Sequence, residues 1–457
     1  MDIKRLFIAN RGEIAVRIIR ACQKLGIETV IGVSTADRQT LAAKIADRAV
    51  CIGPAAAPES YLKMGTVVTA AKETGCHAVH PGYGFLAENA QFQRLCTGHG
   101  LAFVGPPAAV IESLGDKVQA RLLASDLGLP TVPGNNDVSS VQAAAEFGRH
   151  KGYPFLLKAS AGGGGRGMRV VRAANEVVDA FQGATAEARA SFGNPRLYIE
   201  RYVERARHVE IQIIGDTHGN VVHLGERDCS IQRRHQKLIE ESPSPVVDES
   251  LRARMADAAM RLARHVGYTN AGTVEFIVDL DSGEYYFLEV NTRIQVEHPV
   301  TEMVTGVDLV AEQIRVASGM PLSIAQADIR PAGHAIECRI NAEMVERDFQ
   351  PSPGQITEWQ PPEGMDIRAD THCYSGYCVP PFYDSLIAKL IVRGTDRKTA
   401  ISAMSRALGT FRVSGVHTTI PFHQAVLAHT DFVNGNVTTR WVEEKFMKQA
   451  YQMESIA

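Results

Sequence analysis

Two short β-rich runs near the middle of the chain carry acidic residues that a hairpin would bring together. Residues 273–299 read TVEFIVDLDSGEYYFLEVNTRIQVEHP, and the Asp-Ser-Gly at 281–283 predicts the turn between the two strands. A hairpin centred on this turn places Glu275 directly opposite Glu289. Like charges in that position repel each other, and a divalent cation between them would remove the repulsion.

The register of this hairpin is indicated by its apolar side chains. The preferred register gives three apolar cross-strand pairs, Val274–Val290, Phe276–Leu288 and Val278–Tyr286. A slip by one residue would mix Leu and Glu on one face, which disfavours it. Asn291 lies two residues beyond Glu289 and therefore on the same face, where it offers a third oxygen. Hard oxygen ligands that are few and open to solvent suit Mg²⁺ held together with nucleotide phosphates.

The alternation of polar and apolar residues continues to residue 297. Polar residues occupy the odd positions Glu289, Asn291, Arg293, Gln295 and Glu297. Apolar residues occupy the even positions, and only Thr292 breaks the contrast. A stripe of this kind is commonly the solvated face of an antiparallel strand. The mixture of acids, amides and an arginine, without Lys or Thr filler, favours the floor of a catalytic site instead.

A glycine-rich segment follows a strand predicted at 153–157. Residues 158–168 read KASAGGGGRGM, and four consecutive glycines let backbone N–H groups approach a polyanion closely. Lys158 and Arg166 add positive charge. The Walker pattern does not fit, because its Lys follows the glycines. A flexible hinge is the alternative, but the lysine at the strand end favours a mobile flap that covers phosphates.

A basic cluster lies within residues 226–241, which read ERDCSIQRRHQKLIEE. Its basic residues are Arg227, Arg233, Arg234, His235 and Lys237. Acidic residues flank the cluster and the net charge of the chain is −3, so a nucleic-acid patch is disfavoured. Anion binding in a substrate cleft fits better, with Gln232 and His235 available to hydrogen-bond ribose or phosphate. Some of the arginines are then structural ion-pair partners.

The composition is that of a multidomain globular protein. A length of 457 residues suggests two or three domains, and 45% hydrophobic and 22% charged residues are ordinary values. The charge gives no reason to expect nucleic acid or a membrane as partner. Eight cysteines without metal-binding spacing predict reduced thiols and a cytoplasmic location. The apolar run in MDIKRLFIANRG is too short for a signal peptide or a membrane span.

The first part of the chain alternates strand and helix patterns, which predicts a doubly wound, mostly parallel sheet. Strands are expected at 6–9, 29–33, 50–53 and 78–81. One expected helix places Ile14, Ile18, Ala21, Cys22 and Leu25 on a single face and ends at Gly26. No GxGxxG follows the first strand, so NAD is not expected.

The remainder predicts two further parts. The segment 134–137 predicts a linker into a smaller α+β part that ends near Val203. From residue 332 onward many Gly and Pro residues and short strands predict a mixed α+β part, carried by 367–383 and 385–392. A final amphipathic helix is expected at 442–450.

Ordered motifs along essentially the entire chain resemble those of the biotin carboxylases, a family of ATP-grasp enzymes. They are IANRGEIAVRIIRAC near the N-terminus, HPGYGFLAEN at 80–89, GDK at 115–117, KASAGGGGRGMRVV from 158, RHVEIQ from 207, ERDCSIQRRHQK from 226, EVNTRIQVEHPVTEM from 289, ECRINAE from 337 and PSPG from 351. The set is specific because the motifs share order and separation. The resemblance implies a fold of mixed α/β and α+β class: an N-terminal Rossmann-like domain (1–114), an ATP-grasp domain (115–330) with a mobile glycine-rich lid at about 131–203, and a C-terminal mixed α+β domain (331–457).

The resemblance also implies roles for particular residues. The implied nucleotide contacts are Lys117, Lys158, Gly164, Gly165, Glu200, Arg201, Tyr202, Val203, His208, Gln232 and His235. The implied ligands of Mg²⁺ or Mn²⁺ are Glu275, Glu289 and Asn291. The implied bicarbonate site is Lys237, Arg293, Gln295 and the backbone of Val296, with Glu297 as general base. Arg339 is implied to face the biotin ureido group, with Tyr83 near the biotin pocket. Residues 200–203 read ERYV where relatives often have EKYL, a conservative change at a hinge that binds adenine mainly through its backbone.

The implied activity is ATP- and Mg²⁺-dependent carboxylation of biotin by bicarbonate through carboxyphosphate. The string nearest to a biotinylation motif, FMKQ at 446–449, falls in the expected final helix, so biotin is expected on a separate carrier protein. Carboxyltransferase subunits would complete the enzyme, for example an acetyl-CoA carboxylase of fatty acid biosynthesis, and the family is commonly homodimeric.

The alternatives are another ATP-grasp carboxylate–amine ligase and a non-catalytic paralogue that organises the carrier and transferase. HPGYGFLAEN, RIQVEHP and Arg339 argue against the first, and the presence of every catalytic residue type argues against the second.

Overall fold

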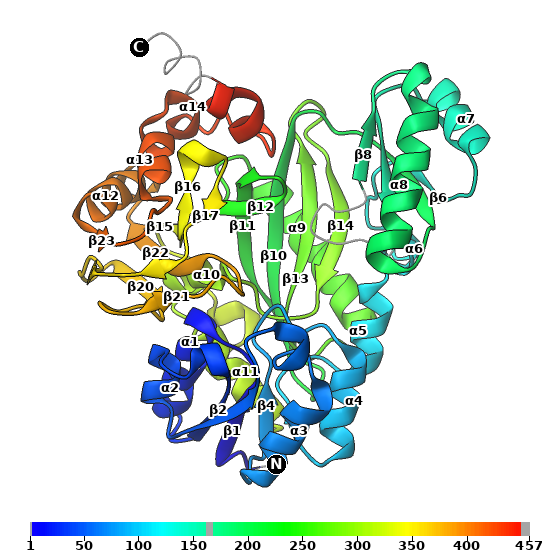
Figure 1. The fold of residues 1–457 in the computed structure, drawn as a ribbon. Helices are drawn as coiled ribbons and strands as arrows, with labels where there is room; N and C mark the ends of the chain where they lie inside the picture. Colours follow the sequence, from blue (N-terminus) through cyan, green and yellow to red (C-terminus); the bar gives the residue numbers. More distant parts are fainter. Residues whose placement is uncertain (1, 161–167, 449–457) are drawn as a thin grey trace.

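Residues 2–160 and 168–448 are described by a computed structural model of the chain, shown in Figure 1. Gly164 and Gly165, two of the predicted nucleotide contacts, lie outside the described residues. Among the described residues, no helix combines the length and the apolar content that crossing a membrane requires.

The N-terminal part is a five-stranded parallel sheet with helices on both faces, as predicted. Its strands are ordered β3-β2-β1-β4-β5 and comprise β1 (Arg5–Ile8), β2 (Glu28–Ser34), β3 (Arg48–Gly53), β4 (Ala78–His80) and β5 (Ala102–Phe103). Its helices are α1 (Gly12–Lys24), α2 (Leu41–Ile45), α3 (Met64–Glu73), α4 (Ala90–Gly98) and α5 (Ala108–Gly115). Leu6 and Ile8 enter one hydrophobic core and Phe7 enters another, because successive side chains of β1 point to opposite faces. Helix α1 ends just before Gly26, whose φ of 68° is the left-handed conformation common after a helix.

A long antiparallel sheet forms the centre of the molecule (Figure 1). Its strand order is β14-β13-β10-β11-β12-β15-β22-β20. The strands are β10 (Ala206–Gly215), β11 (Val221–Arg233), β12 (Gln236–Ser242), β13 (Asn270–Asp279), β14 (Tyr285–Asn291), β15 (His334–Asn341), β20 (Ile367–Thr371) and β22 (Leu386–Gly394). Strands from both sides of residue 330 therefore hydrogen-bond into one sheet, through the pairing of β12 with β15.

The two faces of this sheet differ in chemistry. Along β10, Val209, Ile211 and Ile213 point into an apolar core that contains side chains of α5, α6 (Lys117–Asp126) and α9 (Glu249–His265). The intervening His208, Glu210 and Gln212 point to the other face and are buried as well. Helix α10 (His298–Thr305) packs on that second face, where Val300 and Val304 contact Ala335 and Ile391. The central sheet is thus apolar on one face and polar yet buried on the other.

The predicted hairpin forms, but its register is only half correct. Val274 pairs with Val290 and Glu275 with Glu289 as predicted, and Gly283 in the turn has a φ of 71°. Beyond that point the pairs are Phe276–Phe287, Ile277–Tyr286 and Val278–Tyr285, so the predicted pairs Phe276–Leu288 and Val278–Tyr286 are wrong. The cause is a bulge at Leu288, which turns Phe287 and Tyr285 toward the same apolar core as Val290.

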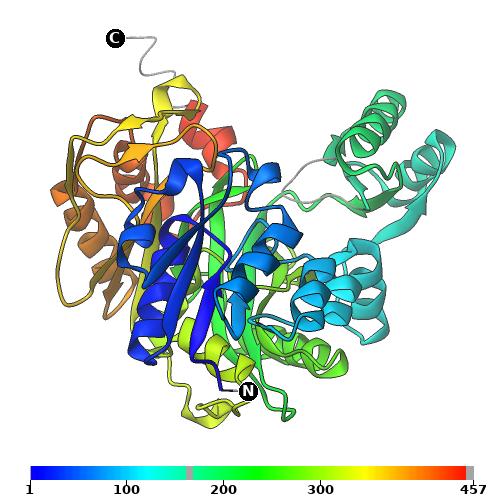
Figure 2. The ribbon, with the colours of Figure 1, turned by 60° about the horizontal axis from the view of Figure 1, so that its bottom comes forward.

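The segment predicted to be a lid forms a separate four-stranded sheet ordered β6-β9-β7-β8. It comprises β6 (Gly134–Val138), β7 (Phe155–Ala159), β8 (Met168–Val171), β9 (Leu197–Arg201), α7 (Val141–Lys151) and α8 (Val177–Phe192). The predicted linker at 134–137 is therefore wrong, since these residues are an edge strand that pairs with β9. The sheet has its own hydrophobic core and projects from the rest of the protein, at the upper right of Figure 1 and the right of Figure 2.

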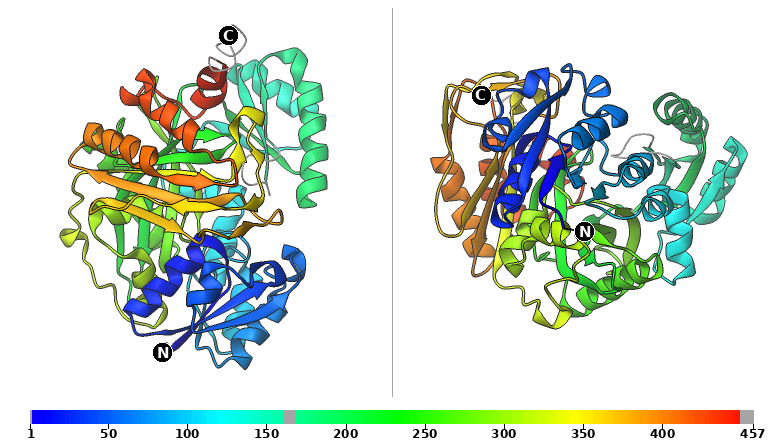
Figure 3. Two further views of the ribbon diagram at one scale, coloured as in Figure 1. Left: turned by 60° about the vertical axis from the view of Figure 1, so that its left-hand side comes forward. Right: turned by 90° about the horizontal axis from the view of Figure 1, so that it is seen from below.

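The C-terminal part lies on the side of the molecule away from the lid (Figure 3). Helices α12 (Arg397–Thr410) and α13 (Ile420–Ala428) pack against β15 and β22 and share one hydrophobic core with them. Short strand pairs and the helix α14 (Thr430–Val433) complete it: β16 (Glu343–Met344) with β17 (Gln350–Pro351), β18 (Gly354–Gln355) with β21 (Cys378–Val379), and β19 (Glu358–Gln360) with β23 (Arg412–Ser414). The predicted final helix is described only to residue 448 and begins as a π-helical turn over Val442–Phe446.

Hydrogen exchange tests whether the projecting sheet is a nucleotide-dependent lid. A unit that packs mainly on its own core opens more readily than the central sheet. We expect amides of β7 and β8 to exchange faster than those of β10 and β13 without ATP, and to slow when ATP is added. Mass spectrometry of peptides from 155–159 and 168–171 measures this, with β10 peptides as the internal control. Exchange in these peptides that does not respond to ATP would contradict the lid.

Candidate active site

Three carboxylates and one guanidinium form a single row across the polar face of the central sheet. Glu289 of β14 is opposite Glu275 of β13, Glu275 is opposite Glu210 of β10, and Glu210 is opposite Arg227 of β11. Like charges on directly opposite residues repel, so this row requires cations from elsewhere in the chain. The structure supplies them from three separate elements.

Lys237 on β12 is the central cation of the site. Its Nζ donates to Glu210 Oε2 at 2.6 Å, to Glu275 Oε1 at 3.0 Å and to Glu297 Oε1 at 2.6 Å. All three donor positions of the ammonium are therefore used by carboxylates. Burial alone would lower the pKa of Lys237, but the surrounding anions outweigh it and hold that pKa well above its usual range.

The carboxylates respond in the opposite direction. Burial would raise the pKa of Glu275, yet Lys237 and His208 outweigh it and hold that pKa well below its usual value. The pKa of Glu297 is lowered in the same way, since the attraction of Lys237 and Arg339 exceeds the effect of burial. Both groups are therefore ionised at neutral pH.

Arg339 on β15 connects Glu297 to a further buried acid. Its Nε donates to Glu240 Oε1 at 2.6 Å, and its NH2 group donates to Glu297 Oε2 at 2.9 Å. Glu297 therefore accepts from Lys237 on one oxygen and from Arg339 on the other. This carboxylate is the point at which two cations of different strands meet.

Arg227 holds the row together through several buried hydrogen bonds. Its side chain is fully buried, and its Nε donates to Glu210 Oε1 at 2.5 Å. Its other nitrogens donate to Gln212, Thr301, Thr273 and Gln295. The planar fork of an arginine suits such a set, because each nitrogen is fixed relative to the others.

The residues after Asn291 leave the sheet. Strand β14 ends at Asn291, and residues 292–297 form a loop that leads into α10, which has Pro299 in its first turn. A strand face through residue 297, the alternative considered for this stripe, is therefore wrong. The polar residues of the stripe nevertheless reach the site, because the loop folds back over the polar face.

Each polar residue of that loop contacts the site or its edge. Arg293 Nε donates to Glu88 at 2.8 Å, and its NH2 group donates to Asn291 Oδ1 at 2.9 Å. Gln295 Nε2 donates to Glu275 Oε1 at 2.7 Å. The carbonyl of Val296 accepts from Lys389 Nζ at 2.8 Å.

The predicted nucleotide contacts surround the end of the carboxylate row. Lys117, the first residue of α6, lies 2.6 Å from Glu289, and His208 Nε2 lies 3.0 Å from Glu275. Lys158 at the end of β7 donates to Glu200 at 2.9 Å, and Arg121 donates to the other oxygen of Glu200 at 2.7 Å. The structure thus joins Lys117 and His208 directly to the predicted metal ligands and places Lys158 beside the predicted hinge.

The remaining predicted nucleotide residues are more peripheral. Arg201 donates to Asp279 at 3.0 Å, Tyr202 faces Arg440, and Val203 follows β9. Gln232 is buried near the end of β11, opposite Lys237. His235 is exposed in the β11–β12 turn, with a φ of 63°.

Tyr83 connects to the loop through a buried chain of polar groups. Its hydroxyl donates to Glu13 Oε1, and Glu13 Oε2 lies 3.1 Å from Lys389 Nζ. Because Lys389 also donates to the Val296 carbonyl, Tyr83 supports the loop indirectly. Its predicted place beside biotin stays a prediction.

The basic segment does not form a surface patch. Arg227 is internal, while Arg233 and Arg234 both pair with Asp348. The structure supports the interpretation of these arginines as ion-pair partners.

Several residues of the site were not found by sequence reasoning. They are Glu88, Glu210, Arg227 in its structural role, Glu240, Glu337, Glu13 and Lys389. Glu210 carried a usable signal, because it lies two residues from His208 in a strand and therefore shares its face. Glu240 and Lys389 carried none, since their partners are about a hundred residues or more away in the chain.

The donor set at the end of the row fits a hard divalent cation. Glu275, Glu289 and Asn291 offer carboxylate and amide oxygens, which are the ligands that Mg²⁺ and Mn²⁺ prefer. The amide nitrogen of Asn291 is buried without a hydrogen-bond partner among the described residues, and its oxygen is oriented by Arg293. A second grouping of possible ligand atoms, His208, Glu210 and Glu275, shares one residue with this set.

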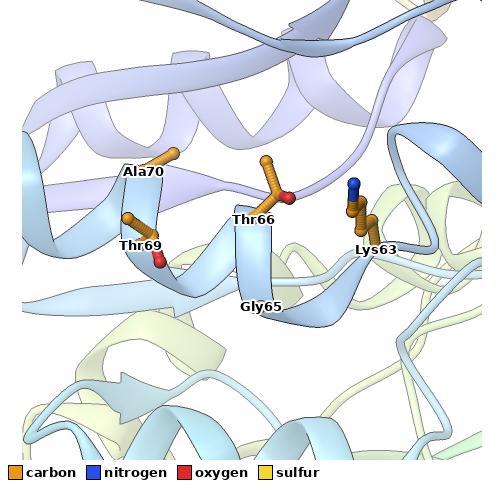
Figure 4. Close-up of a pocket in the computed structure, with 5 residues that line it drawn as sticks. All are labelled: Lys63, Gly65, Thr66, Thr69 and Ala70. Carbon is orange, nitrogen blue, oxygen red and sulfur yellow. The ribbon is translucent and has the colours of Figure 1, made fainter.

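A hollow outside the site has little chemistry to offer. It has a volume of about 600 Å³ and lies beside the first turns of α3. Figure 4 shows its lining, which is Lys63, Gly65, Thr66, Thr69 and Ala70. One lysine and two hydroxyls at a solvent-facing helix supply no acid–base pair.

Three protein families match the chain in sequence. They are the biotin carboxylase N-terminal domain at residues 2–111, the ATP-binding domain of the carbamoyl-phosphate synthase L chain at 116–325, and the biotin carboxylase C-terminal domain at 337–444. Among curated relatives, Biotin carboxylase 1 of Bacillus subtilis is 54% identical over 442 residues, which is 96% of this chain and 98% of the relative. A pyruvate carboxylase subunit of Methanothermobacter thermautotrophicus is 50% identical over 441 residues, which is 96% of this chain and 89% of the relative.

Solved structures resemble the fold closely. A biotin carboxylase–βγ-ATP complex from Campylobacter jejuni gives a TM-score of 0.94 at 45% identity and covers 96% of this chain and 98% of its own. The biotin carboxylase domain dimer of Hydrogenobacter thermophilus 2-oxoglutarate carboxylase, in complex with MgADP, ADP and bicarbonate, gives 0.93 at 47% identity and covers 97% and 98%.

The stability role of Arg227 can be tested against an exposed arginine. Arg227→Met leaves buried carboxylate, amide and hydroxyl groups without their donor, and removing one partner of a buried ion pair costs about 3–5 kcal/mol. Arg205→Met removes an exposed ion pair with Asp281, for which about 1 kcal/mol or less is expected. Urea unfolding followed by circular dichroism compares the two midpoints. Equal shifts for both variants would contradict the role assigned to Arg227.

Proposed function

The chain belongs to the biotin carboxylase family of ATP-dependent ligases, and from this premise we propose which groups of its polar sheet face carboxylate carrier-bound biotin with bicarbonate. One observation carries the proposal. Glu297 accepts from Lys237 on one oxygen and from Arg339 on the other. In our proposal Lys237 belongs to the bicarbonate site and Arg339 to the biotin site, so Glu297 stands between the two substrates.

The nucleotide is held at the open end of the carboxylate row. Lys117, Lys158 and His208 contribute positive charge or hydrogen bonds to the phosphates, with Gly164 and Gly165 in the flap. Residues 200–203 hold adenine, and Gln232 and His235 contact the remaining nucleotide groups. Glu275, Glu289 and Asn291 hold Mg²⁺ or Mn²⁺, which when bound offsets charge on the transferring phosphoryl group.

Bicarbonate lies between Lys237, Arg293, Gln295 and the N–H group of Val296. An anion that binds Lys237 competes with Glu297 for the ammonium, which raises the pKa of Glu297 toward that of a useful base. Glu297 then takes the proton of bicarbonate, and the freed oxygen attacks the γ-phosphorus of ATP. The products are ADP and carboxyphosphate. The cations act mainly by electrostatic stabilisation in a site that excludes water.

Biotin is carboxylated in the second half of the reaction. Carboxyphosphate breaks its carboxyl C–O bond to give CO₂ and phosphate, and the phosphate takes the N1 proton of biotin. The negative charge then lies on the ureido oxygen, where the Arg339 guanidinium stabilises it. N1 attacks CO₂ and forms N1-carboxybiotin.

The partners follow from the same chemistry. Relatives named for pyruvate and 2-oxoglutarate carboxylases share this domain, so the acceptor is selected outside it. We propose a biotin carboxyl carrier protein and carboxyltransferase subunits as partners. A homodimer is supported by the dimer in the Hydrogenobacter thermophilus structure. A cytoplasmic location is supported by eight cysteines that are all free thiols.

The metal role of Glu289 gives one prediction. Glu289→Gln removes the charge of one proposed ligand, so ATP turnover should fall and the Mg²⁺ concentration for half-maximal activity should rise about tenfold or more. Glu284→Gln is the matched control, because Glu284 lies in the same hairpin but pairs with the exposed Arg254. Bicarbonate-dependent ADP release is measured across a Mg²⁺ titration. An unchanged Mg²⁺ requirement would mean that Glu275 and Glu289 are ordinary polar residues of a sheet face and do not bind the metal.

The two half-reactions give a second prediction. Arg339→Ser should keep much of the biotin-independent, bicarbonate-dependent ATPase while carboxylation of free biotin falls about 10²–10³-fold. Glu297→Ala should lower both activities by about 10²–10⁴-fold, because without deprotonated bicarbonate no carboxyphosphate forms. Arg393→Ser is the control, because Arg393 lies on β22 and the substitution removes an exposed ion pair with Asp366.

Folding and ATP binding are checked first in each variant, since Arg339 also holds two buried carboxylates. The assignment fails if Arg339→Ser abolishes the ATPase as thoroughly as Glu297→Ala does. The wild-type assay tests the alternative as well. Stimulation of the ATPase by an amine substrate, and not by free biotin, would favour a carboxylate–amine ligase.

A further inference from the structure

We propose that Glu240 and Glu337 form a buried carboxyl pair that holds one proton between them and positions Arg339 for the biotin half-reaction. The inference rests on the proposed role of Arg339. It adds two residues that touch no substrate and act through the guanidinium.

The pair is defined by the sheet register. Glu240 of β12 is directly opposite Glu337 of β15, and both side chains are 0% exposed. Opposite residues of an antiparallel pair have Cβ atoms about 4.5–5.5 Å apart and point to the same face. The two carboxyl groups therefore face each other in an interior without water access.

The pair lacks hydrogen-bond donors, and one shared proton would supply a donor. Glu240 Oε1 accepts from Arg339 Nε. Glu240 Oε2 and both oxygens of Glu337 have no donor among the described residues. A buried acceptor without a donor costs free energy, and two carboxylates side by side cost more. A proton on Glu337 that is shared with Glu240 Oε2 removes both costs.

The surrounding cations are already used. Arg339 is shared between Glu240 and Glu297, and Lys237 of β12 is bound by three carboxylates. Lys389 of β22 is opposite Arg339 in the sheet and attracts Glu337, but it pairs with Glu13 and donates to the Val296 carbonyl. Two further titratable groups, Cys229 and Cys338, are neutral thiols, because burial raises the pKa of each well above its usual value. No described cation is left for a second negative charge on the pair.

Titration behaviour agrees with this geometry. Burial raises the pKa of Glu240 to about 7, although Arg339 offsets part of the effect. Burial also raises the pKa of Glu337 well above its usual value, against the attraction of Lys389. Two acids so coupled lose their protons as a pair. Near neutral pH the pair carries one negative charge.

That single charge suits the proposed task of Arg339. When Glu297 takes a proton from bicarbonate, its bond to the NH2 group of Arg339 weakens, while Glu240 still holds Nε. The free edge of the guanidinium then faces the ureido oxygen of biotin. Loss of the shared proton would place a second negative charge beside the developing biotin anion, so biotin carboxylation should fall at alkaline pH.

The test compares two substitutions and two activities. Glu337→Gln is an isostere of the neutral acid that cannot ionise. It should move the alkaline limb of biotin carboxylation upward by about one pH unit or more, relative to the limb of the biotin-independent ATPase of the same preparation. Glu240→Gln weakens the charge-assisted bond to Arg339 and should lower biotin carboxylation at least about tenfold more than the ATPase. A Glu337→Gln profile that coincides with the wild-type profile would overturn the proposal.

A second measurement does not depend on activity. Infrared pH-difference spectra of the wild-type protein should show a protonated carboxyl C=O band near neutral pH that disappears at alkaline pH, and that shifts in Glu240→Gln. Absence of the band would overturn the shared proton. If free biotin fails to stimulate the wild-type enzyme while the band is present, the proposed function fails and the carboxyl pair stands.

Discussion

The structure depends on the electrostatic compensation of a carboxylate row buried in a sheet. Glu289, Glu275 and Glu210 lie on three adjacent strands, and a water-poor environment strengthens their repulsion. The compensating cations are Lys117 from α6, Lys237 from β12 and Arg227 from β11. Only the Arg227–Glu210 pair joins consecutive strands, and the other pairs join elements that do not follow each other in the chain. The site therefore forms only when the helix, the hairpin and the distant strands have all reached their places. A buried pair of this kind adds little net stability, but breaking it is costly. The arrangement therefore enforces one geometry, which is what a site for two anionic substrates requires.

The same compensation explains how the three parts of the chain cooperate. The N-terminal part contributes Glu13, Tyr83 and Glu88 at its edge, the central part contributes the row, and the C-terminal part contributes Arg339 and Lys389. Lys389 is one point of contact among them, because it pairs with Glu13 and donates to the Val296 carbonyl. The loop that carries Arg293, Gln295 and Glu297 is consequently fixed from both sides. Its irregular backbone gives the polar groups three different directions that a strand could not provide, since a strand would point all of them one way.

Sequence reasoning recovered the elements and part of the site for identifiable reasons. The Glu275–Glu289 pairing followed from a turn signal and a two-residue period, and both are local properties. The pairing beyond Phe276 did not follow, because the bulge at Leu288 is selected by how Phe287 and Tyr285 pack in the core. The strand at 134–138 was missed since its Gly-Asn-Asn-Asp sequence has turn composition, and its strand conformation depends on pairing with β9. Residues with distant partners, such as Glu240 and Lys389, carry no local signal. The motif resemblance proposed the functional residues, while the structure supplied the groups that contact them.

The pairing of β12 with β15 has a consequence for how the protein is made. Residues 206–291 can form their hairpins as they leave the ribosome, but the pairing edge of β12 stays open until residues 334–341 have been synthesised. During that interval Glu240 lacks Arg339, and a strand with free backbone groups is exposed to other nascent chains. The last third of the chain thus acts as an internal cover for an aggregation-prone edge. Premature termination before β15 would yield an inactive fragment that also tends to aggregate. Such fragments are bound by chaperones and degraded by proteases.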